Sequence, residues 1–252
     1  MTRQANRNPV LFAALVAGLV LSCGCAAKRV APQIQRGEAE HIELEPQQFM
    51  DILVAALEAK AKIEATTEIP IELNDLVIQE IAFFLGPARK QLKLGFERMP
   101  DFQEEIVSIL EDKTVPRELI YVAFVESRFN PEAVSPSGAK GMWQFTDETA
   151  KHLGLNIGKT NDQRKDVSAS TEAAARYLKT LHGKFGDWYF ALAAYNAGPG
   201  EVGRLIERYR LKSYWEMCSS DVPVKDETKR YVAQFIAAVL IFEAPEKFGV
   251  GK

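Results

Sequence analysis

Apolar residues recur at intervals of three and four along most of this chain, which is the spacing of one face of an α-helix. No segment alternates apolar and polar residues over the length of a strand. The pattern therefore predicts an all-α fold, with at most a short β-turn or ribbon between Asn130 and Gly141. The predicted helices cover residues 47–65, 76–84, 88–98, 146–153, 171–185, 188–195, 202–209 and 227–242, and two more begin at Pro100 and Pro116.

Polar residues just before several of these apolar runs are typical helix caps. Asp101, with Glu104 three residues later, resembles a capping box. Pro116 suits the first turn of a helix, because a residue there has no intrahelical partner for its N–H group. The predicted caps are Asn74 or Asp75, Asp101, Thr114, and Ser168 or Ser170.

One apolar run ends in an acidic residue. Residues 119–125 are apolar on nearly every side and lead directly into Glu126, and Pro131 prevents the helix from continuing. A carboxyl group at the point where a buried helix gives way to a loop is desolvated, which raises its pKa toward that of a general acid. By position alone, a solvated Glu126 or a pair with Arg128 is the simpler interpretation.

Four short segments change that interpretation. They are Glu-Ser at 126–127, Gly-Met-Trp-Gln at 141–144, Ala-Tyr-Asn-Ala-Gly at 194–198 and Glu-Thr-Lys-Arg-Tyr-Val at 227–232. In this order they resemble the signatures of lytic transglycosylases of the soluble-transglycosylase type. The resemblance covers roughly residues 116–242, and more loosely the helices from Leu73. It implies a lysozyme-like all-α catalytic domain preceded by a helical N-terminal arm.

The resemblance also implies a reaction. Such enzymes cleave the β-1,4 bond between N-acetylmuramic acid (MurNAc) and N-acetylglucosamine (GlcNAc) of peptidoglycan without water, and leave 1,6-anhydro-MurNAc ends. Glu126 would act as the single general acid and base, with the substrate's own N-acetyl group assisting. Other acids near it in sequence are Glu132, Asp147 and Glu148, whose polar surroundings are typical of solvated side chains. A lysozyme-like hydrolase and an inactive glycan-binding protein remain as alternatives.

The same segments supply candidate contacts to a sugar chain. Hydroxyl and amide groups can bond sugar hydroxyls and N-acetyl groups, and glycines let the backbone approach a ligand closely. For Trp143 and Phe145, core packing is the alternative, and Asn196 also suits a helix end for backbone reasons alone. The candidate substrate-binding residues are Ser135, Ser137, Met142, Gln144, Tyr195, Asn196 and Tyr231.

Composition removes several other classes of function. A net charge of −3 gives no electrostatic reason to expect a nucleic-acid partner. The three histidines are scattered and no calcium-binding loop motif occurs, so we expect no metal and no cofactor. Cys218 is the only cysteine far from the N-terminus, which leaves no pair for a disulfide framework in the folded part. The hydrophobic fraction of 47% is enough for a sizeable core.

The N-terminus indicates export. A basic, polar start precedes an apolar stretch over 9–21 that is short for a membrane-spanning helix. Val20 and Ser22 before Cys23 resemble the lipobox of bacterial lipoproteins, which implies that Cys23 is lipidated. Cys25 is the second choice, and an ordinary secretory signal cut after residue 26 or 27 is the third. We expect a lipid-anchored protein of the outer membrane that faces the periplasm of a Gram-negative bacterium.

These features divide the chain into a lipoprotein signal peptide (1–22), a tether (23–46), a helical N-terminal region (47–115) and a lysozyme-like catalytic domain (116–252). The implied partners are peptidoglycan glycan strands and, through the lipid anchor, a membrane. Proteins of cell-wall synthesis or division could recruit such an enzyme, but no motif identifies one.

Overall fold

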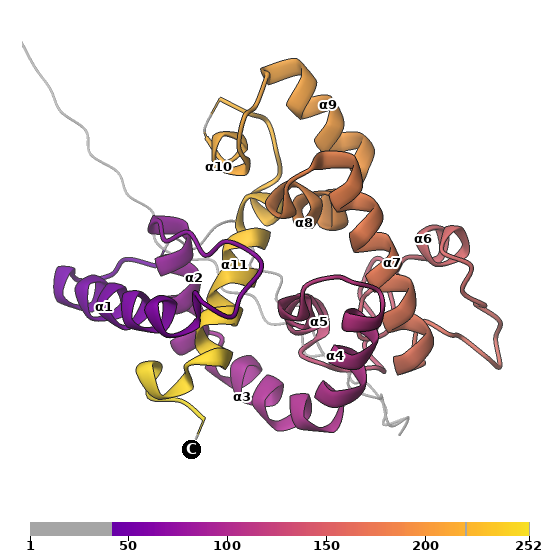
Figure 1. Cartoon of the computed structure of the whole chain (residues 1–252), viewed down its shortest axis with the longest axis horizontal. Helices are drawn as coiled ribbons and strands as arrows, with labels where there is room; N and C mark the ends of the chain where they lie inside the picture. Colours follow the sequence, from indigo (N-terminus) through magenta and orange to yellow (C-terminus); the bar gives the residue numbers. More distant parts are fainter. Residues whose placement is uncertain (1–41, 220, 252) are drawn as a thin grey trace, which may run out of the picture.

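The computed structural model describes residues 42–219 and 221–251, whose regular elements are all helical (Figure 1). The α-helices are α1 (Pro46–Ile63), α2 (Asp75–Leu85), α3 (Arg89–Arg98), α4 (Gln103–Asp112), α5 (Ile120–Ser127), α6 (Asp147–His152), α7 (Val167–Phe185), α8 (Trp188–Ala197), α9 (Pro199–Tyr209), α10 (Tyr214–Met217) and α11 (Asp226–Glu243). Short 3-10 turns cover Met99–Asp101, Arg117–Leu119 and Pro245–Phe248. The predicted all-α class is confirmed. The proposed signal peptide and both candidate lipidation sites lie outside the described residues.

The predicted helix starts are correct in part. Asn74 caps α2, because its side-chain oxygen accepts a hydrogen bond from the Val77 backbone N–H at 3.1 Å. The predicted start of the 171–185 helix is wrong: α7 begins at Val167 and is capped by Asp166, whose carboxylate accepts from the Ala169 N–H at 2.7 Å. Ser170 is buried inside this helix instead, since a carboxylate four residues earlier already fills the capping position.

Two other predicted caps are also wrong. Asp101 belongs to a 3-10 turn and α4 begins after Phe102 without a side-chain cap, so the capping box does not form. Thr114 adopts a left-handed backbone conformation, with φ of 56°, rather than the extended conformation of a cap. The chain turns there and α5 begins at Ile120, after a short 3-10 turn.

Helix α11 is the centre of the core. Between Tyr231 and Phe242 every residue except Gln234 is buried, and a helix buried on all sides must be surrounded by other helices. It contacts α1 and α2 on one side and α5 and α8 on the other (Figure 1). The hydrophobic core extends without interruption from Ala56 to Ala244, so the proposed ranges 47–115 and 116–252 share it.

A buried ion pair also joins α2 to α11. The Glu80 side chain is 1% exposed and receives hydrogen bonds from Arg230 Nε at 2.5 Å and from Gln234 Nε2 at 3.1 Å. Removing one partner of such a pair leaves a buried charge without compensation. This contact fixes the turn of α11 that carries Tyr231.

The loop between α5 and α6 contains the predicted β-turn. Isolated antiparallel bridges join Val134 to Lys140 and Lys140 to Phe145. Gly141 has φ of +81°, and a Cβ atom there would overlap the carbonyl oxygen of Arg164. Only glycine combines this conformation with such a close approach. The loop is thereby pressed against the segment before α7.

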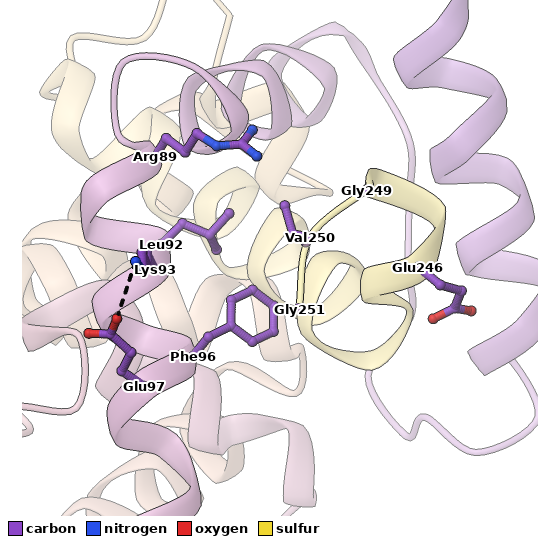
Figure 2. Close-up of a pocket in the computed structure, with 9 residues that line it drawn as sticks. All are labelled: Arg89, Leu92, Lys93, Phe96, Glu97, Glu246, Gly249, Val250 and Gly251. Carbon is purple, nitrogen blue, oxygen red and sulfur yellow. Dashed lines mark ion pairs between the residues drawn. The ribbon is translucent and has the colours of Figure 1, made fainter.

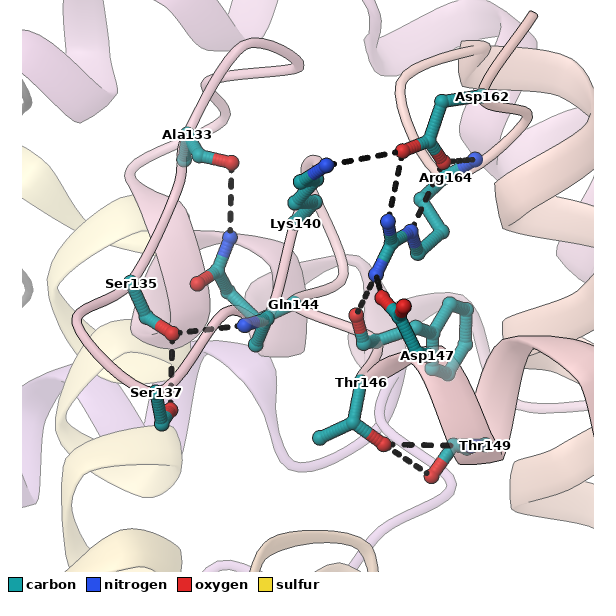
Figure 3. A network of polar contacts seen from close by, with 12 residues as sticks. Ala133, Ser135, Ser137, Lys140, Gln144, Thr146, Asp147, Thr149, Asp162 and Arg164 are labelled. Carbon is teal, nitrogen blue, oxygen red and sulfur yellow. Dashed lines mark hydrogen bonds and ion pairs between the residues drawn. The ribbon is translucent and has the colours of Figure 1, made fainter. Parts of the chain in front are cut away.

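Arg164 holds that segment in place. Its guanidinium is 2% exposed and donates hydrogen bonds to the carboxylates of Asp162 and Asp147 and to the Phe145 carbonyl (Figure 3). Lys140 adds an ion pair to Asp162 at 3.3 Å.

None of the helices in the described part of the chain has the length and apolar character needed to cross a bilayer.

Candidate active site

Glu126 occupies the last turn of α5, and an unusual chain reversal follows it. Arg128 and Phe129 both have left-handed backbone conformations, with φ of 58° and 56°. Such conformations are strained in residues other than glycine and are retained where the surrounding structure enforces them. Ser127 enforces this one: its hydroxyl reaches the Met142 carbonyl at 2.8 Å and accepts from the Asn130 N–H at 3.0 Å. The position of Glu126 is therefore set by the loop that follows.

The phenol of Tyr231 contacts this carboxyl group directly. Tyr231 lies on α11, and its hydroxyl donates a hydrogen bond to Glu126 Oε1 at 2.6 Å. Burial, followed by the charge of Glu126, raises the pKa of Tyr231 well above its ordinary value, so the phenol stays protonated. Tyr231 is a candidate substrate-binding residue from its motif, and in the structure its phenol lies against the carboxyl group of Glu126.

The pKa of Glu126 is raised from 4.5 to about 7. Desolvation by burial is the largest cause, and the nearby charge of Glu227 raises it further. The hydrogen bond from Tyr231 and the charge of Arg128 act in the opposite direction. The carboxyl group is thus present in both protonation states near neutral pH. A group with such a pKa is suited both to donate and to accept a proton.

A cavity of about 130 Å³ opens beside Glu126. Its walls are formed by one face of α3, by the end of α5 and by the loop that precedes α6. The lining residues are Lys90, Gln91, Leu94, Arg98, Glu126, Ser127, Arg128, Ala133, Val134 and Gln144. A larger cavity of about 650 Å³ lies between α3 and the C-terminal turn (Figure 2). The smaller cavity is the candidate site, because it holds the carboxyl group with the shifted pKa.

The loop side chains divide into two groups. Gln144 lines the cavity of Glu126, and its Nε2 donates to the Gly141 carbonyl at 2.7 Å. The hydroxyls of Ser135 and Ser137 lie 2.9 Å apart, and Ser135 also accepts from the Ala139 N–H at 2.9 Å (Figure 3). The two serines therefore stabilise the loop, whereas Gln144 is placed beside Glu126.

Other candidate residues lie behind the cavity. Met142 is fully buried, so its side chain offers no surface to a sugar in this structure. Trp143 and Phe145 also pack in the core, as their alternative interpretation proposed, and Trp143 Nε1 donates to Thr171 Oγ1 at 3.0 Å. Tyr195 donates from its hydroxyl to the Trp143 carbonyl at 2.8 Å, which joins α8 to the loop.

Asn196 connects the end of α8 to the start of α11. Its Oδ1 accepts a hydrogen bond from Thr228 Oγ1 at 2.8 Å, and its Nδ2 lies 3.5 Å from a carboxylate oxygen of Glu227. The side chain is half-buried. These contacts join the end of α8 to Thr228 and Glu227 in the first turn of α11.

Two of the three acids close to Glu126 in sequence are engaged elsewhere, and the third, Glu148, is exposed. Glu132 pairs with Lys165 at 2.6 Å, and Asp147 pairs with Arg164. Glu227, which sequence reasoning missed as a second carboxylate, acts on the pKa of Glu126 instead. It could have been found from its spacing, because residues four apart lie on the same face of a helix and Tyr231 follows it by four. Within the described residues, no three His, Cys, Asp or Glu side chains gather as they would around a metal ion.

Comparison with known proteins finds similar sequences. Residues 107–218, fewer than half of the residues of this chain, match the family model described as the transglycosylase SLT domain. The resemblance recognised from the four segments is confirmed.

Individual relatives match over more residues than this domain contains. Membrane-bound lytic murein transglycosylase D of Escherichia coli is 35% identical over 150 residues, which are 58% of this chain and 32% of that protein. Membrane-bound lytic murein transglycosylase F of Shewanella loihica is 28% identical over 215 residues, 81% of this chain and 44% of that protein. The chain thus spans about a third to a half of the length of these relatives.

A solved structure shares the fold. The inactive mutant of lytic transglycosylase Slt from Pseudomonas aeruginosa superposes with a TM-score of 0.50 and 20% identity, over 82% of this chain and 38% of that one. At this identity the likeness concerns the fold alone.

Proposed function

We propose that this protein is a peptidoglycan lytic transglycosylase, which cleaves the MurNAc–GlcNAc β-1,4 bond without water and produces 1,6-anhydro-MurNAc ends. The observation that carries the proposal is Glu126 itself, a carboxyl group with a pKa of about 7 on the wall of a cavity and 2.6 Å from the Tyr231 hydroxyl. The SLT domain match supports the reaction class.

In the first step, protonated Glu126 acts as the general acid. Tyr231 engages Oε1, so we assign the transferred proton to Oε2, which gives it to the oxygen that links the two sugars. The C1–oxygen bond breaks as the proton arrives. The carbonyl oxygen of the substrate's own N-acetyl group stabilises the positive charge at C1, as in other substrate-assisted glycosidases.

In the second step, the same carboxylate acts as the base. It takes the proton from the C6 hydroxyl of MurNAc, whose oxygen then bonds to C1 and closes the 1,6-anhydro ring. The proton returns to Glu126, so the cycle consumes no water. A pKa near the working pH suits this double role, because neither protonation state is strongly disfavoured.

One observation favours a second candidate function. Hydrolysis of the lysozyme type needs a second carboxylate, which activates water or forms the covalent intermediate. Glu227 is exposed at the start of α11 and its charge acts on Glu126. A hydrolase that uses Glu126 and Glu227 is therefore the alternative, and the mass of the cleavage products distinguishes the two reactions.

Replacement of Glu126 tests the site in either case. We expect Glu126→Gln to lower turnover of purified peptidoglycan by at least about 10²–10⁴-fold, while glycan binding and cooperative unfolding persist. Glu132→Gln is the matched control, because Glu132 pairs with Lys165 away from the cavity. Full turnover by the Glu126→Gln protein would contradict both the transglycosylase and the hydrolase proposals, because both use Glu126 as the acid.

We also propose that the chain is exported and anchored by lipid on Cys23, with residues 1–22 removed and 23–46 acting as a tether to the helical body. The lipobox-like sequence supports this, and the relatives above are named membrane-bound. Intact-mass analysis of membrane-extracted protein tests it. We expect Cys23→Ala to abolish the lipid mass and Cys25→Ala to retain it; the reverse result would assign the anchor to Cys25.

A further inference from the structure

The cavity beside Glu126 has a cationic wall. Lys90 and Arg98 reach it from α3, and Arg128 reaches it from the end of α5. Glu126 is the only acid among the lining residues, and its pKa of about 7 leaves it partly uncharged at neutral pH. Three cations therefore face a group that cannot fully balance them.

Arg128 is the least satisfied of the three. Its side chain is 5% exposed, and its Nε is buried without a hydrogen-bond partner among the described residues. Burial, and then the charge of Arg98, lower its pKa to about 10 against the effect of Glu126. A buried guanidinium with an unpaired donor is unfavourable unless an anion accompanies it.

The backbone beside these cations is strained at Arg128. Arg128 is held in its left-handed conformation, and Arg98 Nη1 donates to the Arg128 carbonyl at 3.2 Å. Helix α3 can approach closely because Gly95 faces the ring of Phe124, where a Cβ atom would collide with it. A closely packed arrangement that places a guanidinium with an unpaired Nε on the wall of an open cavity indicates a binding site.

We propose that Lys90, Arg98 and Arg128 form a carboxylate-binding subsite beside Glu126 that takes a carboxylate of the glycan substrate. This inference rests on the proposed function. Peptidoglycan offers carboxylates on its attached peptides and, in strands without peptides, on the lactyl group of MurNAc. A guanidinium is well matched to either, because its planar fork bonds both carboxylate oxygens.

The size of the cavity agrees with such a group. At about 130 Å³ it can hold several water molecules, but it is smaller than the roughly 300–1,000 Å³ of ordinary small-molecule sites. It therefore accepts one substituent of the strand while the sugars lie across its mouth. The bound carboxylate would also offset the charge of Arg128 that opposes protonation of Glu126.

Helix α3 supplies a matched control. Lys93 is exposed, lines the other cavity and forms an ion pair with Glu97 at 3.7 Å (Figure 2). Lys93→Gln therefore removes the same charge as Lys90→Gln from the same helix without touching the proposed subsite. Any general effect of net charge on an anionic substrate appears equally in both variants.

The test compares three glycans: peptide-bearing strands, peptide-free strands with a free lactyl carboxylate, and a chitooligosaccharide without carboxylates. Their affinities are measured by equilibrium binding in the Glu126→Gln background, and KM in the active enzyme. We expect Lys90→Gln to weaken binding of a carboxylate-bearing strand by about tenfold, the effect of roughly one charge-assisted hydrogen bond, and Arg98→Gln to weaken it further. Lys93→Gln should leave the affinity unchanged.

The pattern of losses identifies the source of the carboxylate. Weaker binding of peptide-bearing strands assigns the subsite to the peptide, and weaker binding of peptide-free strands assigns it to the lactyl group. An equal loss of affinity for all three glycans, or no loss of affinity for any of them, would contradict the proposed subsite. A wild-type protein that cleaves none of them would contradict the proposed function, whereas the binding series would still decide the subsite.

Arg128 provides an independent check. Arg128→Lys keeps the charge but lacks the planar fork, and Arg128→Gln lacks both. We expect affinity for the carboxylate-bearing strand to decrease in the order Arg, Lys, Gln, with thermal unfolding used to confirm that each variant folds. If Arg128→Gln does not fold, the Lys90→Gln single variant replaces it, and an unchanged affinity there would contradict the proposal.

Discussion

The Tyr231 hydroxyl donates a 2.6 Å hydrogen bond to Glu126 Oε1 and joins two residues 105 positions apart in the sequence. Glu126 ends α5, and Tyr231 lies on the central helix α11, in the turn fixed by the Glu80–Arg230 pair. The contact orients the carboxyl group and lowers its pKa against the larger effect of burial. The protonation of the catalytic candidate therefore depends on the packing of the core.

Loss of this hydrogen bond should change the pH dependence of the reaction. Glu126 acts first as an acid, so activity should decline as pH rises through its pKa of about 7. Tyr231→Phe removes a contact that lowers this pKa, and we expect the alkaline limb of the kcat profile to move to higher pH while kcat falls. A pH–rate profile measures both effects. An unmoved or downward-shifted limb would show that Tyr231 does not control this proton.

Glu227 should have the opposite effect. Its negative charge raises the pKa of Glu126, so Glu227→Gln should move the alkaline limb to lower pH. In the transglycosylase account this variant still turns over, because Glu227 takes no part in bond cleavage. Loss of turnover comparable to that of Glu126→Gln would instead favour the two-carboxylate hydrolase. Glu216→Gln, at an exposed acid on α10, is a suitable control.

The stability of the fold should also depend on pH through the raised pKa of Glu126. The pKa of Glu126 is about 7 in the fold and 4.5 ordinarily, so between these values the folded state binds more protons than the unfolded state. Stability is therefore lost as pH rises from about 4.5 to about 7. We expect Glu126→Gln to be more stable than wild type at pH above 7, by up to roughly 3 kcal/mol, with a smaller difference in acid. Urea unfolding across this pH range tests it, and a difference that does not change with pH would contradict the raised pKa.

Two glycines of the loop between α5 and α6 should respond differently to substitution. Both have left-handed backbone conformations, but a Cβ at Gly141 overlaps the Arg164 carbonyl, whereas one at Gly138 meets nothing within 4 Å. Gly138→Ala should cost about 1–2 kcal/mol from strain alone, and Gly141→Ala clearly more, because the loop must move. Denaturant unfolding of the pair measures this, and equal losses would show that contact with Arg164 is unimportant.

The sequence predicted the helices better than their ends. Apolar spacing located α1, α2, α8 and α11, because burial of one face dominates the choice of structure. The start of α7 was missed because Asp166, Ser168 and Ser170 are all good caps, and only the tertiary position of the preceding loop selects among them. Thr114 failed as a cap because its backbone is left-handed, and its hydroxyl accepts a hydrogen bond from Lys179, 65 positions later in the sequence.

The site was predictable only where a residue's role is local or carried by a motif. Glu126 and Tyr231 were identified through the four segments and lie together. Glu227 was missed as a second carboxylate, because it is distant in sequence from Glu126. The cationic wall could not be predicted from the sequence either. Lys90 and Arg98 have the spacing of a polar helix face, and only tertiary packing brings that face to the cavity that Arg128 lines.

The most direct measurement is the mass of muropeptides released from peptidoglycan by the purified protein in isotopically labelled water. We expect ends that are one water lighter than hydrolysed ends and that contain no label, and we expect Glu126→Gln to release none. Reducing ends that carry one labelled oxygen would contradict the non-hydrolytic reaction and establish the hydrolase.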